Sequence, residues 1–230
     1  MFREEQIGDC RLILGDCREV MASWPECFKV DAVVTDPPYG IGENHKKVAS
    51  RGKLAAARDY GEFNWDSEPA AASTINHIRA ISQWQIIFGG NYFELPPSSC
   101  WLIWDKQNGE NDFADCEMAW TNMPKAVRRV YWRWNGMIRK GHEEREHPTQ
   151  KPLGVMQWCI GHLPCEGTIL DPFMGSGTTG VACVKLDRKF IGIELEQKYF
   201  DIACKRIEKA YNEPRLPLAQ PKMKQEAMQL

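Results

Sequence analysis

The chain has 230 residues, of which 43% are hydrophobic and 26% charged, a composition typical of one globular domain with a full core. No apolar run approaches the roughly 18 residues that a membrane span needs, and the charged residues 1–5 do not match a signal peptide. The sequence therefore predicts a cytoplasmic protein that does not bind membranes. The net charge of −2 argues against nucleic-acid binding by the chain as a whole, but not against a local basic face.

Short apolar runs alternate with longer amphipathic segments, which favours a parallel sheet covered by helices. In chain order we expect a strand at 12–14, a helix at 17–24, a strand at 31–35, a helix at 70–84, strands at 84–88 and 99–104, a strand or hairpin within 117–134, a helix at 152–162, a strand at 168–170, a helix at 178–186, a strand at 189–193 and a helix at 196–210. One domain is expected over 1–211, interrupted by a long polar loop at 41–66 and an irregular region at 105–146. The Pro-containing residues 212–230 are expected to be a disordered tail.

The nine cysteines are scattered, and no pair has the close spacing of a zinc site. We expect reduced thiols, mostly packed in the core, and no metal centre.

A glycine-rich turn joins the predicted strand 168–170 to the helix that follows it. Its glycines match G-x-G-x-x-G, a pattern that permits a tight turn and a close approach of backbone to a ligand: Gly175, Gly177 and Gly180. Glu194 ends the next strand, where its carboxylate can accept both ribose hydroxyls of a nucleoside. The glycine pattern alone also fits a dinucleotide oxidoreductase, or a tight turn without a ligand.

Asp171, at the start of this turn, distinguishes a dinucleotide cofactor from S-adenosylmethionine. A carboxylate would repel the pyrophosphate of a dinucleotide, but it would attract the ammonium group of S-adenosylmethionine. Phe173 is expected to pack on the same cofactor, although an aromatic residue after a strand also suits the core.

Asp36, Pro37, Pro38 and Tyr39 form a second turn, directly after the predicted strand 31–35. Two prolines fix φ and remove two backbone donors, so the turn is rigid and presents a carboxylate, a bare Pro37 carbonyl and an aromatic ring. The carboxylate and the carbonyl can each accept one N–H of a planar amine, and Tyr39 can stack on the ring that carries this amine. These four residues are the predicted catalytic turn.

Three motifs, in this order, resemble those of the β-class DNA amino methyltransferases: Asp36–Tyr39, His147–Pro152, and Asp171–Thr178 followed by 191–194. The resemblance covers about 10–210. It implies a Rossmann-like α/β fold, with a mostly parallel twisted sheet, helices on both faces and a circularly permuted motif order. It also implies S-adenosylmethionine as the cofactor and DNA as the substrate.

The resemblance assigns further cofactor contacts. Asp16 matches a residue that contacts the adenine of the cofactor, and Thr149 and Lys151 are candidates for its methionine carboxylate. A solvated surface lysine is the other interpretation of Lys151. The full set of expected cofactor residues is Asp16, Cys17, Thr149, Lys151, Asp171, Phe173, Gly175, Gly177, Thr178 and Glu194.

Two stretches, 44–58 and 118–142, contain basic residues and no acid, so together they could form one positive face. Ordinary solvated surface is the alternative for each. The residues expected to contact double-stranded DNA are Lys46, Lys47, Arg51, Lys53, Arg128, Arg129, Arg133 and Arg139. Target recognition is expected within 41–66 and 105–146.

The predicted reaction is methylation of N6 of a flipped adenine, as part of a restriction-modification system. Asp at the first position of the turn favours adenine in the family. N4 methylation of cytosine, a DNA-binding relative without activity and a dinucleotide oxidoreductase are the alternatives. A homodimer is possible, but the sequence does not specify the oligomeric state.

Overall fold

The computed structural model describes residues 2–40, 68–108, 114–135, 138–139 and 150–213. Within these residues, nine strands form one mixed sheet. In spatial order they are β1 (Arg3–Ile7), β2 (Cys10–Leu14), β11 (Phe190–Glu194), β10 (Ile169–Asp171), β3 (Val30–Thr35), β4 (Ser82–Phe88), β6 (Cys116–Thr121), β5 (Trp101–Asp105) and β7 (Arg128–Tyr131). A separate pair consists of β8 (Trp134–Asn135) and β9 (Ile138–Arg139).

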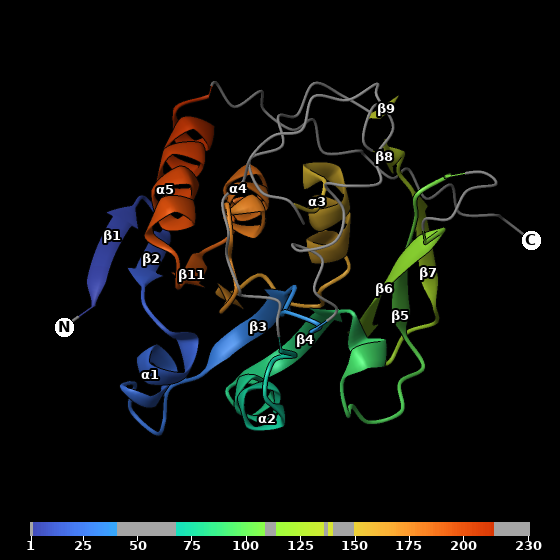
Figure 1. Cartoon of the computed structure of the whole chain (residues 1–230), viewed down its shortest axis with the longest axis horizontal. Helices are drawn as coiled ribbons and strands as arrows, with labels where there is room; N and C mark the ends of the chain where they lie inside the picture. The colour runs from blue at the N-terminus through green and yellow to red at the C-terminus, as the bar shows by residue number, and fades with distance from the viewer. Residues whose placement is uncertain (1, 41–67, 109–113, 136–137, 140–149, 214–230) are drawn as a thin grey trace, which may run out of the picture.

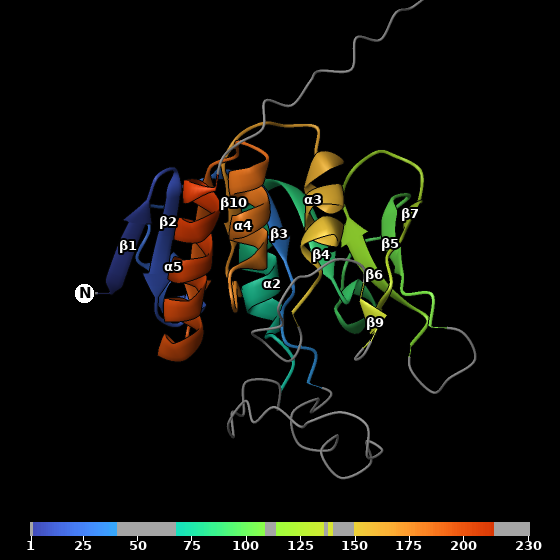
Figure 2. The ribbon, with the colours of Figure 1, turned by 90° about the horizontal axis from the view of Figure 1, so that it is seen from above.

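Helices cover both faces of the sheet, as Figures 1 and 2 show. One face packs against α3 (Leu153–Gly161), α4 (Thr178–Lys185) and α5 (Gln197–Asn212). The other packs against α1 (Cys17–Ala22) and α2 (Ala72–Ala80), and a short 3-10 turn, η1 (Gly90–Tyr92), follows β4. In the described part of the chain, no helix is both long and apolar enough to cross a bilayer.

Each face has its own hydrophobic core, because successive strand residues point to opposite sides. In β3, Val33 belongs to the core under α1 and α2, whereas Val34 belongs to the core under α3, α4 and α5. The helix α5 buries Tyr199, Phe200, Ala203, Ile207 and Ala210 at the three- and four-residue spacing of one helical face. Cys10, Cys17, Cys100, Cys159 and Cys183 are buried thiols.

The five strands β2, β11, β10, β3 and β4 are parallel, so their carboxyl ends meet at one edge. The chain passes from β10 through α4 to β11 on one side of β10, while β3, on its other side, comes from far earlier in the sequence. Such a change of direction opens a crevice at the carboxyl ends, where ligands of open α/β sheets bind. The predicted fold class is confirmed, and the two predicted turns lie at this crevice.

Three local predictions need correction. β1 was not predicted, because this edge strand is polar and exposed and carries no alternating pattern. The predicted helix 70–84 ends at Ala80, and residues 82–88 instead extend β4 alongside β3. β6 and β7, within the predicted hairpin region 117–134, do not pair with each other, because β5 lies between them. Pairing partners depend on tertiary contacts that local sequence does not specify.

Phe200 offers a test of the larger core. Its side chain is fully buried beneath α5, so Phe200→Ala should lower the free energy of unfolding by about 3–5 kcal/mol. Val127→Ala, at a residue that is 52% exposed, is the control and should change it by less than about 0.5 kcal/mol. Urea denaturation measures both, and a loss below about 1 kcal/mol for Phe200→Ala would contradict this packing.

Candidate active site

Asp171, the last residue of β10, joins the two predicted turns. Its Oδ1 accepts a hydrogen bond from Thr35 Oγ1 at 2.8 Å and another from the backbone N of Phe173 at 3.1 Å. Its Oδ2 accepts one from Thr179 Oγ1, on α4, at 2.6 Å. Thr35 is the residue directly before Asp36, so this carboxylate fixes the catalytic turn relative to the glycine-rich turn.

Burial raises the pKa of Asp171 to about 6, although the hydrogen bonds from Thr179, Thr35 and Phe173 act in the opposite direction. Asp36 adds a smaller electrostatic contribution that also raises it. A neighbouring cation would lower this pKa and stabilise the charged form. The site is therefore electrostatically suited to a positively charged ligand.

Glu194, the last residue of β11, lies beside the glycine-rich turn. Its Oε2 accepts a hydrogen bond from Gly175 N and its Oε1 accepts one from Glu196 N, both at 2.8 Å. Each oxygen keeps a lone pair, and the side chain is partly exposed, as acceptance of two ribose hydroxyls requires. Burial raises its pKa to about 7, with Asp171 and Glu196 adding to the effect.

At the later glycines of the turn, a side chain would collide with the protein itself. A Cβ at Gly177 would lie 2.8 Å from the Cβ of Ala203, and one at Gly180 would lie 2.5 Å from Cδ1 of Ile207. Gly177 also has a φ of +80°, which a side chain would disfavour. The G-x-G-x-x-G pattern here allows α4 to pack closely on α5, a reason that the sequence alone did not reveal.

The catalytic turn is held by contacts at its carboxylate and at its ring. Tyr39 Oη donates a hydrogen bond to Asp36 Oδ1, and the Tyr39 ring stacks on Tyr92 with centroids 4.9 Å apart. Gly89 has no side chain because a Cβ there would lie 2.1 Å from the Tyr39 ring. Burial, followed by the charge of Asp36, raises the pKa of Tyr39 well above its ordinary value, so this hydroxyl remains a donor.

The two prolines leave their carbonyls as acceptors. Pro38 O accepts a hydrogen bond from Ala70 N at 3.0 Å. Among the described residues, no group donates to the Pro37 carbonyl, which is consistent with the acceptor role that the sequence suggested for it.

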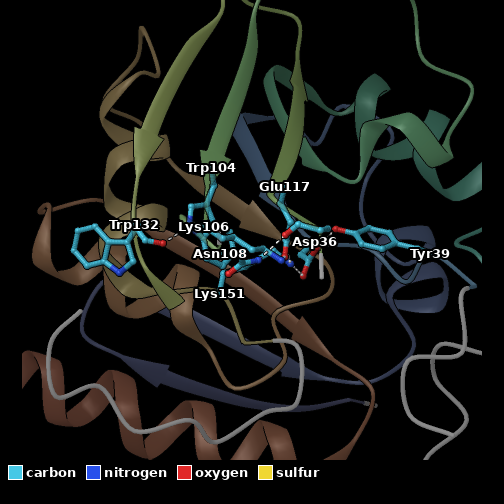
Figure 3. A network of polar contacts seen from close by, with 9 residues as sticks. Asp36, Tyr39, Trp104, Lys106, Asn108, Glu117, Trp132 and Lys151 are labelled. Atoms are coloured by element: carbon cyan, nitrogen blue, oxygen red, sulfur yellow. Dashed lines mark hydrogen bonds and ion pairs between the residues drawn. The ribbon is translucent and has the colours of Figure 1, made fainter. Parts of the chain in front are cut away.

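Lys151 lies at a different place from the one expected. Its Nζ donates to Asp36 Oδ2 and is 3.1 Å from Glu117 Oε2, in β6 (Figure 3). Its side chain is only 8% exposed, which excludes the solvated-surface interpretation. The structure thus gives Lys151 a contact with the carboxylate of Asp36, where the resemblance suggested the carboxylate of the cofactor.

The segment that precedes α3 connects both turns. Gln150 Oε1 accepts a hydrogen bond from Ser176 Oγ of the glycine-rich turn at 3.3 Å, while the next residue, Lys151, binds Asp36. Thr149 lies outside the described residues.

The remaining predicted cofactor residues have partners within the protein. Asp16 accepts a hydrogen bond from Arg18 N at 2.8 Å and so caps the N-terminus of α1. Asp16 lies close to Glu194, because the backbone N of the preceding Gly15 donates to Glu194 O. Cys17 is buried against the second core, and Phe173 packs against that core in part. Thr178 Oγ1 accepts a hydrogen bond from Arg206 of α5 at 3.1 Å. Their assignment to the cofactor remains a prediction.

The predicted DNA contacts are only partly described. Lys46, Lys47, Arg51 and Lys53 lie outside the described residues, as does the side chain of Arg139 in β9. Arg133 is exposed between β7 and β8. Arg129, on the edge strand β7, is 3.8 Å from Asp105 and stacks on Tyr131 at 4.4 Å. Burial, together with the charges of Lys125 and Arg128, lowers the pKa of His162, the residue that follows α3.

Sequence reasoning missed Glu117, Lys106 and Tyr92. Glu117 and Lys106 form an ion pair at 2.7 Å beside Lys151, and neither belongs to a recognisable motif. Only the pairing of β6 with β4 brings Glu117 to the catalytic turn. Tyr92 did have a signal, since it follows Gly89-Gly90 at the carboxyl end of a strand neighbouring β3.

Comparison with known proteins identifies the family to which the chain is similar. A family model described as DNA methylase matches residues 95–205. The Type II methyltransferase M2.MboI of Moraxella bovis is 37% identical over 238 residues, covering 84% of this chain and 85% of the relative. The Type II methyltransferase M.HinfI of Haemophilus influenzae is 26% identical over 264 residues, covering 92% and 72%.

Solved structures give the same result for the fold. The M1.HpyAVI–SAM complex is 27% identical, with a TM-score of 0.59, and the match covers 86% of this chain and 98% of that one. The cytosine-N4-specific PvuII DNA methyltransferase is 14% identical, with a TM-score of 0.50 and coverage of 88% and 91%. At that identity, the second comparison supports the fold alone.

A mostly parallel sheet covered by helices on both faces, with the Asp36–Tyr39 turn and the glycine-rich turn side by side at its carboxyl edge, is the architecture of an S-adenosylmethionine-dependent methyltransferase. Because M2.MboI matches more than four fifths of both chains, this chain belongs to the N6/N4 family of DNA amino methyltransferases. The dinucleotide oxidoreductase hypothesis is therefore wrong.

Glu194 generates a prediction for cofactor binding. Its ionised form attracts a cationic cofactor, so binding should lower its pKa from about 7. As the pH falls below about 7, protonation of the free protein should weaken S-adenosylmethionine binding, by up to about tenfold per pH unit. Calorimetry from pH 5.5 to 8 measures this slope.

Glu194→Gln should weaken binding at pH 8 by roughly 1.5–3 kcal/mol and should flatten the pH dependence between 6 and 7. The exposed Glu208→Gln on α5 is the matched control and should bind like wild type. An identical pH slope in Glu194→Gln and wild type would remove Glu194 from the cofactor site.

Proposed function

We propose that this methyltransferase transfers a methyl group from S-adenosylmethionine to N6 of an adenine that is flipped out of double-stranded DNA. The observation that carries the proposal is the rigid turn Asp36–Tyr39 at the carboxyl end of β3, coupled to the glycine-rich turn through Thr35 and Asp171. This coupling supports a reaction between two ligands, one bound at each turn. The DNA substrate also supports the cytoplasmic location expected from the sequence.

The residues of the cofactor side fit S-adenosylmethionine. Asp171 and Glu194 both have raised pKa values because burial disfavours their charge, and the positive charge of this cofactor would offset that cost. Glu194 offers two oxygens for ribose hydroxyls, and Asp16 lies one strand farther along the same edge. When bound, the cofactor supplies an electrophilic methyl group.

The residues of the catalytic turn fit an exocyclic amine. Asp36 and the Pro37 carbonyl can each accept one N–H, which orients the nitrogen and stabilises the positive charge that develops on it. Tyr39 provides a ring on which a flipped base can stack. A target inside a duplex is out of reach of these groups, so flipping is required. Catalysis then depends mainly on holding the reacting atoms about 3–3.5 Å apart.

Adenine is favoured over cytosine because Asp36, rather than serine, begins the turn. N4 methylation of cytosine requires the same acceptors and is the second candidate. The fold similarity to a cytosine-N4-specific enzyme, at 14% identity, carries no information about which base is methylated.

The experiment measures transfer of a labelled methyl group to unmethylated genomic DNA, followed by digestion to nucleosides. N6-methyladenine supports the proposal, and N4-methylcytosine would replace it by the alternative. Single-molecule sequencing of the same DNA gives the recognised site.

Asp36→Ala should abolish transfer and leave S-adenosylmethionine affinity unchanged, because Asp36 is assigned to the base. A single-turnover rate above about a tenth of wild type, a loss under about 1.4 kcal/mol, would show that this role is wrong. Glu208→Gln is again the control.

The basic residues of β7 generate a separate prediction. Neighbouring strand residues point to opposite faces, so Arg128 and Arg129 cannot both contact DNA on one face. Replacing both with Ala should therefore flatten the slope of log affinity against log salt by about 1, the contribution of one phosphate contact, and not by 2. The single variants identify the contributing residue.

The control is Arg3→Ala, on the far edge strand β1, which should leave the slope unchanged. Cofactor affinity should stay constant in all four proteins. Slopes equal to wild type in both single variants would mean that these arginines are ordinary surface charge.

A further inference from the structure

Four charged side chains of alternating sign form a chain through the catalytic site (Figure 3). Lys106 Nζ lies 2.7 Å from Glu117 Oε1, and Lys151 Nζ lies 3.1 Å from Glu117 Oε2. At the end of the chain, Lys151 Nζ donates to Asp36 Oδ2, and Tyr39 Oη donates to Asp36 Oδ1. Lys151 is thus the link between the catalytic carboxylate and the rest of the chain.

The four groups come from separate parts of the fold. Asp36 follows β3, Lys106 follows β5, Glu117 lies in β6, and Lys151 lies two residues before α3. The side chain of Lys151 is 8% exposed, and those of Lys106, Asp36 and Glu117 are 18%, 21% and 27% exposed. Charges this far from water are costly unless they are paired, and here two cations balance two anions.

Lys151 is aimed at Asp36 more closely than at Glu117. Its Nζ makes a hydrogen bond with Asp36, whereas Glu117 Oε2 is buried and, among the described groups, receives no well-oriented hydrogen bond. A third carboxylate, such as that of a cofactor, would have to compete with Asp36 and Glu117 for this ammonium group. The geometry therefore argues against the role in cofactor binding that the resemblance gave to Lys151.

We propose that Lys151 is a positioning residue that holds Asp36 ionised and oriented towards the target amine, and that Glu117 tunes it by competing for the same ammonium group. The proposal rests on the proposed function, in which Asp36 accepts an N–H of the base. Protonated Asp36 would present a donor to that N–H on one oxygen, so ionisation matters for the reaction.

The charged groups that face Asp36 allow the direction to be worked out. Burial raises the pKa of Asp36, Lys151 lowers it, Glu117 raises it, and the hydrogen bond from Tyr39 lowers it. Asp171 is the remaining acid nearby and interacts with Asp36 electrostatically. Lys106 acts indirectly because it pairs with Glu117, whose pKa falls to about 2 under the influence of Lys151 and Lys106 despite its burial.

Removing Lys151 should therefore raise the pKa of Asp36 further, while removing the charge of Glu117 should lower it. The experiment measures the single-turnover rate of methyl transfer to unmethylated genomic DNA against pH, at saturating S-adenosylmethionine and DNA. In Lys151→Met the acid limb of the profile should move up by about one to three pH units, the range that one close opposite charge produces.

Glu117→Gln should move the acid limb down, because Lys151 then interacts with Asp36 alone. Lys151→Arg should return the limb most of the way to its wild-type position. Lys185→Met, which breaks an ion pair with Glu213 far along α4, is the matched control and should leave the profile unchanged. Circular dichroism confirms that each variant is folded, and calorimetry measures its affinity for S-adenosylmethionine.

Opposite shifts in Lys151→Met and Glu117→Gln support the proposal. If Lys151→Met does not fold, the shift in Glu117→Gln and the recovery in Lys151→Arg still decide it. A weakened affinity for S-adenosylmethionine with an unmoved acid limb would overturn it and return Lys151 to the cofactor. If the wild-type protein transfers no methyl group to a DNA base, the proposed function is refuted instead, so the two failures are distinguishable.

Discussion

The buried carboxylate of Asp171 accepts hydrogen bonds from three separate segments of the chain. Thr35 belongs to β3, Phe173 to the glycine-rich turn and Thr179 to α4. Leaving one of these donors or the carboxylate without its partner would carry a desolvation cost. The Asp36–Tyr39 turn and the glycine-rich turn are therefore fixed to each other through one side chain. Two-substrate chemistry needs such a fixed separation, because small displacements of reacting atoms reduce the rate strongly.

Charge divides the site into two unlike halves. Asp171 and Glu194 have no cation among their described hydrogen-bond partners, and burial raises the pKa of both, which suits a positively charged cofactor. Asp36 and Glu117, by contrast, are balanced by Lys151 and Lys106, which suits a neutral amine that must meet an ionised acceptor. Gln150 and Lys151 are neighbours in sequence and contact one half each. The segment before α3 thus connects the halves that the parallel strands bring together.

The strands β6, β5 and β7 extend the parallel part of the sheet beyond β4. The antiparallel pairing of β6 with β4 brings Glu117 to the edge where β3 ends, while β5 leads into Lys106. The same extension carries Arg128 and Arg129 on its outermost strand. One addition to the sheet therefore completes the charge balance at the catalytic turn and supplies candidate groups for the DNA backbone.

The sequence by itself determined the fold class, the order of most elements and the two turns, because these depend on local features. Apolar runs of strand length, prolines that fix φ and glycines next to acids all act within a few residues. Only the tertiary structure decided that β5 separates β6 from β7, that Gly177 and Gly180 accommodate α5, and that Lys151 binds Asp36 and Glu117. Those outcomes follow from contacts between residues far apart in the chain, in which burial and charge pairing select partners that no local pattern encodes.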